Sequence, residues 1–249
     1  MNSRIFDFEG ILNFRDLGGY PTKTGRTVAW RRLFRSGELR HMTEKDLTKL
    51  KEYIKFHMVI DLRSNYEIEE LGKGILHNSG IKYHNIALFS DGGEREVNLR
   101  MFKGLSNMGE LYLIFIQQKQ FNRGIIEALE IMAETENHPL IFHCAAGKDR
   151  TGILAAIVLS ILDIADEYIV NDYCLSSVRM DVLQDRIKSE FLTDEDIKIL
   201  TDYRWEADAA SMKLFLTSIK KEYVSMTGWV QAQGADITLV KRLESALLV

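Results

Sequence analysis

The stretch Leu140–Leu162 constrains the fold more than any other part of this chain. Three apolar residues, LIF, are followed by the ten-residue run HCAAGKDRTG (His143–Gly152) and then by the apolar stretch ILAAIVLSIL. The first apolar stretch is short enough for a buried strand, whereas the second is too long for a strand and too apolar for an exposed helix. The pattern therefore predicts a strand, a tight loop and a buried helix. We call His143–Gly152 the cysteine loop.

A loop that opens a helix is suited to binding an oxyanion. Successive backbone N–H groups converge at a helix N-terminus, and their partial positive charge attracts a phosphate without a metal. Gly147 permits a backbone conformation that a Cβ atom would hinder. The residues predicted to bind phosphate are Ala145, Ala146, Gly147, Lys148, Asp149 and Arg150.

Cys144 is the predicted nucleophile. The same positive field, with the guanidinium group of Arg150 nearby, favours the thiolate, which is the reactive form of a cysteine. Arg150 can offer two parallel donors to two phosphoryl oxygens, which lysine cannot do. We expect Thr151 to donate a hydrogen bond to the sulfur and His143 to orient the loop rather than to transfer protons.

The pattern H-C-x-x-G-x-x-R-T resembles the signature of the cysteine-dependent protein-tyrosine phosphatase superfamily. With the KDR form of the loop, three further motifs make the chain similar to the atypical bacterial tyrosine phosphatases. These motifs are NFRDLGG (Asn13–Gly19), LFRSGEL (Leu33–Leu39) and VIDLRS (Val59–Ser64), and DEYIVNDYCLSS (Asp166–Ser177) also fits. The match weakens over Ser90–Gly109 and Arg179–Ala207, where segments that contact the substrate are expected.

The resemblance implies a phosphomonoester hydrolase that works through a phosphocysteine intermediate on Cys144. Members of that family act on phosphotyrosine and, in several cases, on phosphoserine, phosphothreonine or phosphoinositides. The implied partner is therefore a phosphorylated protein or a phosphoinositide. Two alternatives stay open: a phosphate-binding module that has lost turnover, and a sulfurtransferase or thiol redox enzyme.

The general acid has three candidates. One aspartate should protonate the leaving oxygen and later take a proton from the attacking water. Asp149 ranks first because it lies inside the loop. Asp91 follows a predicted strand in an SDGG turn that resembles the mobile acid loop of dual-specificity phosphatases, and Asp61 ends the strand VIDL. Arg63 is a bidentate partner for Asp61, which favours a structural role for that carboxylate.

Two further sites keep two interpretations each. Lys148 either binds a second phosphate, as a phosphoinositide headgroup would require, or is a solvated side chain that raises the local positive potential. Arg15 and Asp16, with the glycines that follow them, either form a turn over the site or make an internal salt bridge.

Composition excludes several classes of function. A net charge of −4 gives no basic surface for nucleic acid. The N-terminus lacks the order of a signal peptide, and the most apolar run is shorter than a bilayer span and ends at Asp163, so no membrane anchor is predicted. Two cysteines are too few for a disulfide scaffold, and we expect Cys174 to be a packing residue. The chain is therefore expected in the cytoplasm, although secretion without a signal peptide stays open, as does the oligomeric state.

We predict neither a metal site nor a cofactor, because the histidines show no zinc-ligand spacing. The fold class is α/β, with a central mostly parallel sheet flanked by helices and a helix-rich C-terminal third. Residues 1–249 are expected to form a single phosphatase domain, of which 166–249 is a helical extension that covers the site. Predicted strands lie around Val28–Trp30, Leu33–Arg35, His57–Leu62, Lys82–Leu88 and Leu140–Phe142. Predicted helices cover Thr43–Tyr53, Asn107–Ala133 with a break near Gln120, Ile153–Leu162, Asp166–Val178, Val182–Glu190, Asp194–Tyr203, Asp208–Tyr223 and Asp236–Leu247.

Overall fold

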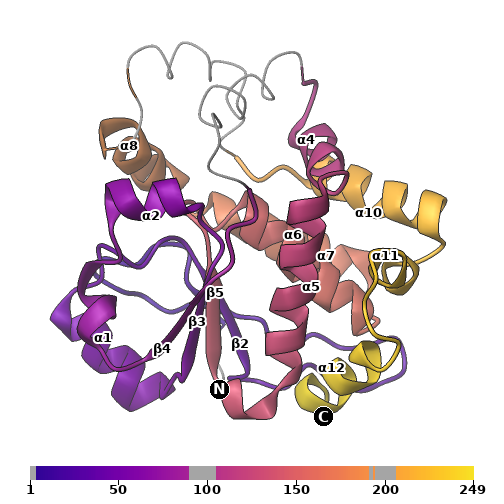
Figure 1. Ribbon diagram of the computed structural model, residues 1–249, viewed down its shortest axis with the longest axis horizontal. Helices are drawn as coiled ribbons and strands as arrows, with labels where there is room; N and C mark the ends of the chain where they lie inside the picture. Colours follow the sequence, from indigo (N-terminus) through magenta and orange to yellow (C-terminus); the bar gives the residue numbers. More distant parts are fainter. Residues whose placement is uncertain (1–3, 90–104, 191–192, 194–205) are drawn as a thin grey trace.

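The computed structural model describes residues 4–89, 105–190, 193 and 206–249. A five-stranded sheet with the order β1-β2-β5-β3-β4 forms the centre of the molecule (Figure 1). Only β1 and β2 are antiparallel, and the other pairs are parallel. The strands are β1 (Arg15–Asp16), β2 (Leu33–Ser36), β3 (Met58–Asp61), β4 (Lys82–Asn85) and β5 (Leu140–His143). The predicted α/β class with a mostly parallel sheet is confirmed.

The parallel register brings the carboxyl ends of three strands to the same level. His143, the last residue of β5, pairs with Ser36 at the end of β2 and with Asp61 at the end of β3. The cysteine loop leaves β5 at this edge, so the segments that follow β2 and β3 flank it on both sides. In open parallel sheets this edge is where ligands bind.

Helices cover both faces of the sheet (Figure 1). The helix α1 continues into a π-helical turn, Leu50–Ile54, and the 3-10 turns are Gly74–Asn78, Thr135–Asn137 and Leu175–Ser177. The α-helices are α1 (Glu44–Lys49), α2 (Asn65–Leu71), α4 (Met108–Phe115), α5 (Lys119–Ala133), α6 (Asp149–Ile161), α7 (Asp166–Cys174), α8 (Met180–Glu190), α10 (Ala209–Tyr223), α11 (Met226–Ala232) and α12 (Leu239–Leu247).

The alternation of side chains along β5 separates two cores. Leu140 and Phe142 point into the larger core, which α5, α6 and the C-terminal helices complete. Ile141 points the other way, into a smaller core that includes Phe34 and Leu50, the first residue of the π-helical turn. Because β5 is covered on both faces, its first three residues, Leu140–Phe142, are all apolar, as in other buried parallel strands.

The helix after the loop is buried as the sequence predicts. Every residue of α6 from Thr151 to Leu159 is buried. Helix α4 ends at Phe115 and α5 begins at Lys119, so the predicted break near Gln120 lies a few residues earlier. Within the described ranges, no helix is long and apolar enough to cross a membrane.

One local prediction needs correction. No strand forms around Val28–Trp30, where Val28 makes only an isolated bridge to Leu248. Helix α11 was not predicted, because its seven residues are too few for a clear helical period. The predicted helix Asp194–Tyr203 lies outside the described residues.

Candidate active site

The cysteine loop turns sharply between β5 and α6. Cys144 is a free thiol with 2% of its surface exposed. Gly147 has a φ of +68°, and a Cβ atom at this position would lie 2.2 Å from the carbonyl oxygen of Ser36. Only glycine meets both conditions, because other residues rarely adopt this φ and the space for a side chain is absent.

Three carbonyl oxygens of the loop are bound from outside. Asn13 donates from Nδ2 to the carbonyls of Ala146 and Gly147 over 3.1 Å each. Arg35 donates from Nη2 to the Gly147 carbonyl over 2.8 Å, and the backbone N–H of Glu38 donates to the Ala145 carbonyl over 2.9 Å. These donors come from the chain before β2, from β2 itself and from the segment after it.

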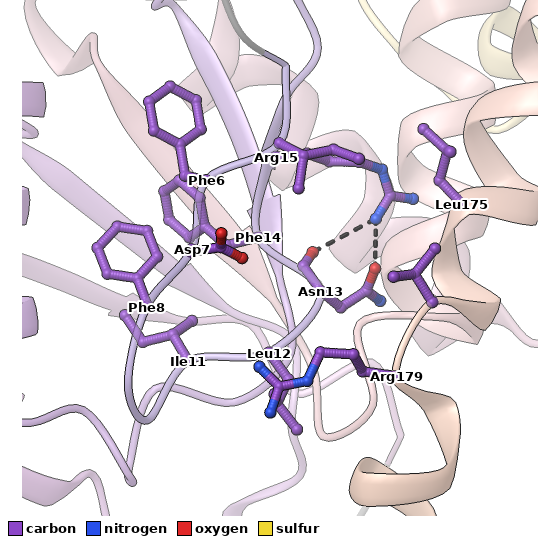
Figure 2. A pocket seen from close by; sticks show the side chains of 12 residues that line it. Phe6, Asp7, Phe8, Ile11, Leu12, Asn13, Phe14, Arg15, Leu175 and Arg179 are labelled. Atoms are coloured by element: carbon purple, nitrogen blue, oxygen red, sulfur yellow. Dashed lines mark hydrogen bonds between the residues drawn. The ribbon is translucent and has the colours of Figure 1, made fainter.

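Asn13 is in turn held by Arg15, as Figure 2 shows. Arg15 donates from Nη1 to the carbonyl of Asn13 over 3.3 Å and also to its Oδ1. Asn13 has a φ of +59°, which its short polar side chain tolerates better than most. The pocket beside these residues is lined by Phe6, Phe8, Phe14, Leu175 and Arg179, among others.

Asp172 of α7 ties this segment to β2. Its carboxylate lies 3.0 Å from Nε of Arg15 and 2.6 Å from Nη1 of Arg35, and all three side chains are buried. Burial alone would raise the pKa of Asp172, but the two guanidinium groups outweigh burial and hold that pKa at about 2. Arg15 and Asp16 therefore do not pair with each other. Asp16 instead accepts the backbone N–H groups of Gly18 and Arg31.

Arg150 is oriented by a carboxylate that the sequence analysis did not select. Glu67 of α2 accepts from Nη1 of Arg150 over 2.5 Å and from Nη2 over 2.8 Å. It also accepts the N–H of Ser64, so it belongs to the capping box of α2. Burial raises the pKa of Glu67, but the charge of Arg150 and the hydrogen bonds from Arg150 and Ser64 together outweigh burial and lower that pKa. The S-x-x-E spacing that begins at Ser64 marks Glu67 as a capping residue, but it does not pair Glu67 with Arg150.

Asp149 lies at the first position of α6 and is 17% exposed. The hydroxyl of Tyr112 donates to its Oδ1 over 2.6 Å, and the ammonium group of Lys148 lies 3.5 Å from the same oxygen. Lys148 is fully buried, so the interpretation of a solvated side chain is wrong. Burial lowers the pKa of Lys148, and Asp149 partly opposes that effect.

Asp61 is completely buried and bound on both oxygens. Arg63 donates from Nε to Oδ1 over 3.0 Å and from Nη2 to Oδ2 over 2.7 Å, and Tyr83 donates its hydroxyl to Oδ2 over 2.7 Å. Burial would raise the pKa of Asp61, but His143, Arg63 and Tyr83 together outweigh burial and keep that pKa well below its usual range. The local pairing of Asp61 with Arg63 agrees with the structural role that the sequence favours. Asp91, the third candidate acid, lies outside the described residues.

His143 and Thr151 lie near the two ends of the cysteine loop. Nδ1 of His143 is 3.2 Å from the carbonyl of Cys144, and Nε2 is 3.6 Å from Oδ2 of Asp61. Burial lowers the pKa of His143, which favours the neutral ring. Oγ1 of Thr151 is buried and makes no hydrogen bond with any described residue, so the predicted contact with the sulfur is not formed in this structure.

Cys174, the second cysteine, is a half-buried free thiol that packs against the larger core, as predicted. Burial raises the pKa of this thiol, and the nearby Asp208 adds to the effect.

One group of described residues has the geometry to hold a metal ion. Glu38, His41 and Glu190 place their ligand atoms within 4.8 Å of one another. Arg40 already forms ion pairs with both carboxylates, 3.0 Å from Glu38 through its Nε. A cation at this position would have to displace that guanidinium group.

The family model of the tyrosine phosphatase family matches residues 6–249. The chain therefore belongs to the tyrosine phosphatase family. It is 30% identical over 181 residues to a tyrosine-protein phosphatase candidate of Cupriavidus necator, a match that covers 69% of this chain and 63% of that protein. It is 25% identical to the triple specificity protein phosphatase PtpB of Mycobacterium tuberculosis, over 98% of this chain and 99% of that protein. A shorter match, 43% identical over 54 residues, is to the inositol diphosphatase DSP4 of Arabidopsis thaliana and covers 22% of this chain and 23% of that protein.

Proposed function

We propose that the protein is a cysteine-dependent phosphomonoester hydrolase. The observation that carries the proposal is the construction of the cysteine loop. Its carbonyl oxygens at Ala145, Ala146 and Gly147 are bound from outside, so the N–H groups of the same loop can converge around an anion above Cys144. Membership of the tyrosine phosphatase family supports the same reading.

Arg150 keeps one edge of its guanidinium group for the substrate. A guanidinium group has five N–H donors. Glu67 takes one from each Nη, and the carbonyl of Leu62 lies 3.4 Å from Nη1 for another. Within the described residues, Nε–H and the second Nη2–H are left, and these two are parallel and adjacent. They match two oxygens of one phosphoryl group.

The reaction proceeds in two displacements. The thiolate of Cys144 attacks phosphorus, an S–P bond forms and the O–P bond to the leaving group breaks, while Asp149 gives its proton to the leaving oxygen. A water molecule then attacks the phosphocysteine. Asp149 takes a proton from that water, phosphate is released and the thiolate of Cys144 is restored.

Asp149 is the aspartate that we propose as the acid. It lies within the loop, and part of its side chain is exposed. Asp61 is fully buried, and Arg63 and Tyr83 already bind both of its oxygens. To act as the acid, Asp61 would have to be protonated and would lose some of those hydrogen bonds before it could contact a substrate.

The proposed substrate is a phosphotyrosine-containing protein, with phosphoserine, phosphothreonine and phosphoinositides as further substrates. The name of the mycobacterial relative, a triple specificity phosphatase, and that of the plant relative, an inositol diphosphatase, support a broad range. Lys148 adds a buried positive charge next to Asp149. A panel of phosphopeptides and phosphoinositides, compared by kcat/KM, ranks the classes.

We further propose that residues 1–249 act as one phosphatase domain in the cytoplasm. The extension 166–249 contributes Asp172, which anchors Arg15 and Arg35, and its apolar side chains share the larger core with α5 and α6. Both cysteines are free, in keeping with a reducing compartment.

The decisive experiment compares the wild type with Cys144→Ser on p-nitrophenyl phosphate. We expect no measurable turnover in the variant, because a hydroxyl group is not ionised at neutral pH, while phosphate still binds. Arg150→Lys should be nearly as inactive. Turnover that survives in Cys144→Ser would overturn the mechanism. A wild type that binds phosphate without turnover would indicate the binding module, and thiol chemistry insensitive to vanadate would indicate the sulfurtransferase or redox alternative.

A further inference from the structure

Two buried tyrosine hydroxyls form a chain that ends on Asp149. Tyr112 of α4 lies 2.6 Å from Oδ1 of Asp149, and the hydroxyl of Tyr173 on α7 lies 2.5 Å from the hydroxyl of Tyr112. Neither tyrosine is more than 1% exposed. Their rings meet edge to face, with centroids 6.1 Å apart. Side chains from two helices therefore converge on the first residue of a third.

The chemistry of the groups fixes the direction of these hydrogen bonds. A phenol carries one hydrogen, and an ionised carboxylate only accepts. Tyr112 therefore donates to Asp149, and its own oxygen accepts from Tyr173. Burial raises the pKa of both phenols well above the ordinary value, so both stay protonated and remain donors. Hydrogen bonds aligned in this way strengthen one another.

Two groups lie close to Oδ1 of Asp149. Oδ1 accepts from Tyr112 and lies 3.5 Å from the ammonium group of Lys148. Tyr112 therefore holds one oxygen of the carboxyl group at a defined position.

The tyrosine rings have little freedom to move. Tyr112 packs edge to face against Phe215 of α10, with ring centroids 6.3 Å apart. Tyr173 lies against Gly152 of α6, where a Cβ atom would be 3.1 Å from its ring. Rigid supports of this kind hold a catalytic group in its productive orientation.

We propose that Tyr112, supported by Tyr173, is a positioning residue that fixes the carboxyl group of Asp149 in the orientation from which it delivers the proton to the leaving oxygen. The inference rests on the proposed function, and specifically on Asp149 as the acid. Neither tyrosine contacts the reacting atoms in this scheme, since they act only through Asp149.

The test compares Tyr112→Phe and Tyr173→Phe with the wild type on a series of aryl phosphates whose leaving groups differ in acidity. We expect Tyr112→Phe to lower kcat about tenfold for poor leaving groups and less than about twofold for a nitrophenolate, which needs little protonation. Tyr173→Phe should act in the same direction with a smaller effect.

Tyr83→Phe is the matched control, because it also removes a tyrosine hydroxyl that donates to an aspartate, in this case Asp61. We expect it to keep the leaving-group dependence of the wild type. Tyr112→Phe should add nothing in an Asp149→Asn background, and thermal unfolding confirms that each variant folds.

The outcomes separate the two proposals. If the loss of kcat in Asp149→Asn is the same for good and poor leaving groups, the acid assignment is wrong, and the role of Tyr112 is lost with it. If Asp149→Asn shows that dependence but both tyrosine variants behave like the wild type, only the positioning role is overturned.

Discussion

Glu67 illustrates how much of this site depends on a residue outside the cysteine loop. Its bidentate contact with Arg150 fixes which guanidinium edge faces the cysteine loop. A long arginine side chain without such a partner would lose rotamer freedom on binding phosphate, at a cost of roughly 1–2 kcal/mol. The contact with Glu67 removes most of that cost before substrate arrives.

We therefore predict that Glu67→Gln lowers kcat/KM about tenfold or more and weakens inhibition by inorganic phosphate. The glutamine amide has one acceptor oxygen, so it can accept from only one Nη of Arg150. The substitution also removes the negative charge that attracts the guanidinium group. Steady-state kinetics with phosphate as a competitive inhibitor measure both effects. Glu69→Gln, an exposed position on the same helix, is the control. Unchanged phosphate inhibition in Glu67→Gln would contradict the orienting role.

Local sequence signals were sufficient to predict the contacts of some site residues but not those of others. Asp61 and Arg63 are two residues apart, so their pairing follows from spacing alone. Glu67 and Arg150 are 83 residues apart, and Tyr112 and Asp149 are 37 apart. Contacts of that kind depend on how the helices pack, which no short motif encodes.

At the scale of elements, helix α7 connects the N-terminal segment to β2 through the side chain of Asp172. Asp172 is the acidic partner of both Arg15 and Arg35 and also accepts from the hydroxyl of Tyr20. Removing one partner of a buried ion pair leaves uncompensated charge and costs about 3–5 kcal/mol.

We accordingly predict that Asp172→Asn lowers the free energy of unfolding by about 3–5 kcal/mol at neutral pH. The pKa of Asp172 is about 2 in the folded protein, below its value of about 3.9 in an unfolded chain. The contribution of Asp172 to the free energy of unfolding is thus complete above about pH 4. It disappears as the pH falls through the pKa that Asp172 has in the folded protein. Urea unfolding between neutral and acidic pH measures this difference. Asp166→Asn, which breaks an exposed ion pair with Lys220, should cost less than about 1 kcal/mol.

The parallel strands β2, β3, β4 and β5 were predictable at this scale, whereas the short strand β1 was not. Continuous apolar stretches identified β3 and β5, because both are buried on two faces. The stretch at Val28–Trp30 has a similar composition but pairs with the C-terminal end of the chain at only one position. Tertiary context decides such a case, and composition does not report it.

At the scale of the whole molecule, the larger core runs from Leu17 near the N-terminus to Leu247 in α12. Trp229 of α11 is 1% exposed within it. The helical extension is therefore packed into the same core as β5 and α6, the two elements that the cysteine loop connects. A core shared in this way favours a single cooperative unfolding transition.

We predict that urea unfolding followed by tryptophan fluorescence coincides with unfolding followed by far-ultraviolet circular dichroism. Trp229→Phe, a variant with a smaller core side chain, should shift both curves to lower urea together. Two separated transitions would show that the extension folds independently of the rest, and the single-domain proposal would then be wrong.

The level ends of β2, β3 and β5 also have a consequence for folding kinetics. The donors that hold the cysteine loop come from Asn13 and Arg35, which are 133 and 112 residues away from the loop carbonyls that they bind. Contacts between such distant parts of a chain form late and slow the folding reaction. The anion-binding shape of the loop should thus appear only after the three strands have paired. A peptide that carries only the strand, loop and helix would contain the whole signature without the framework that gives it its shape.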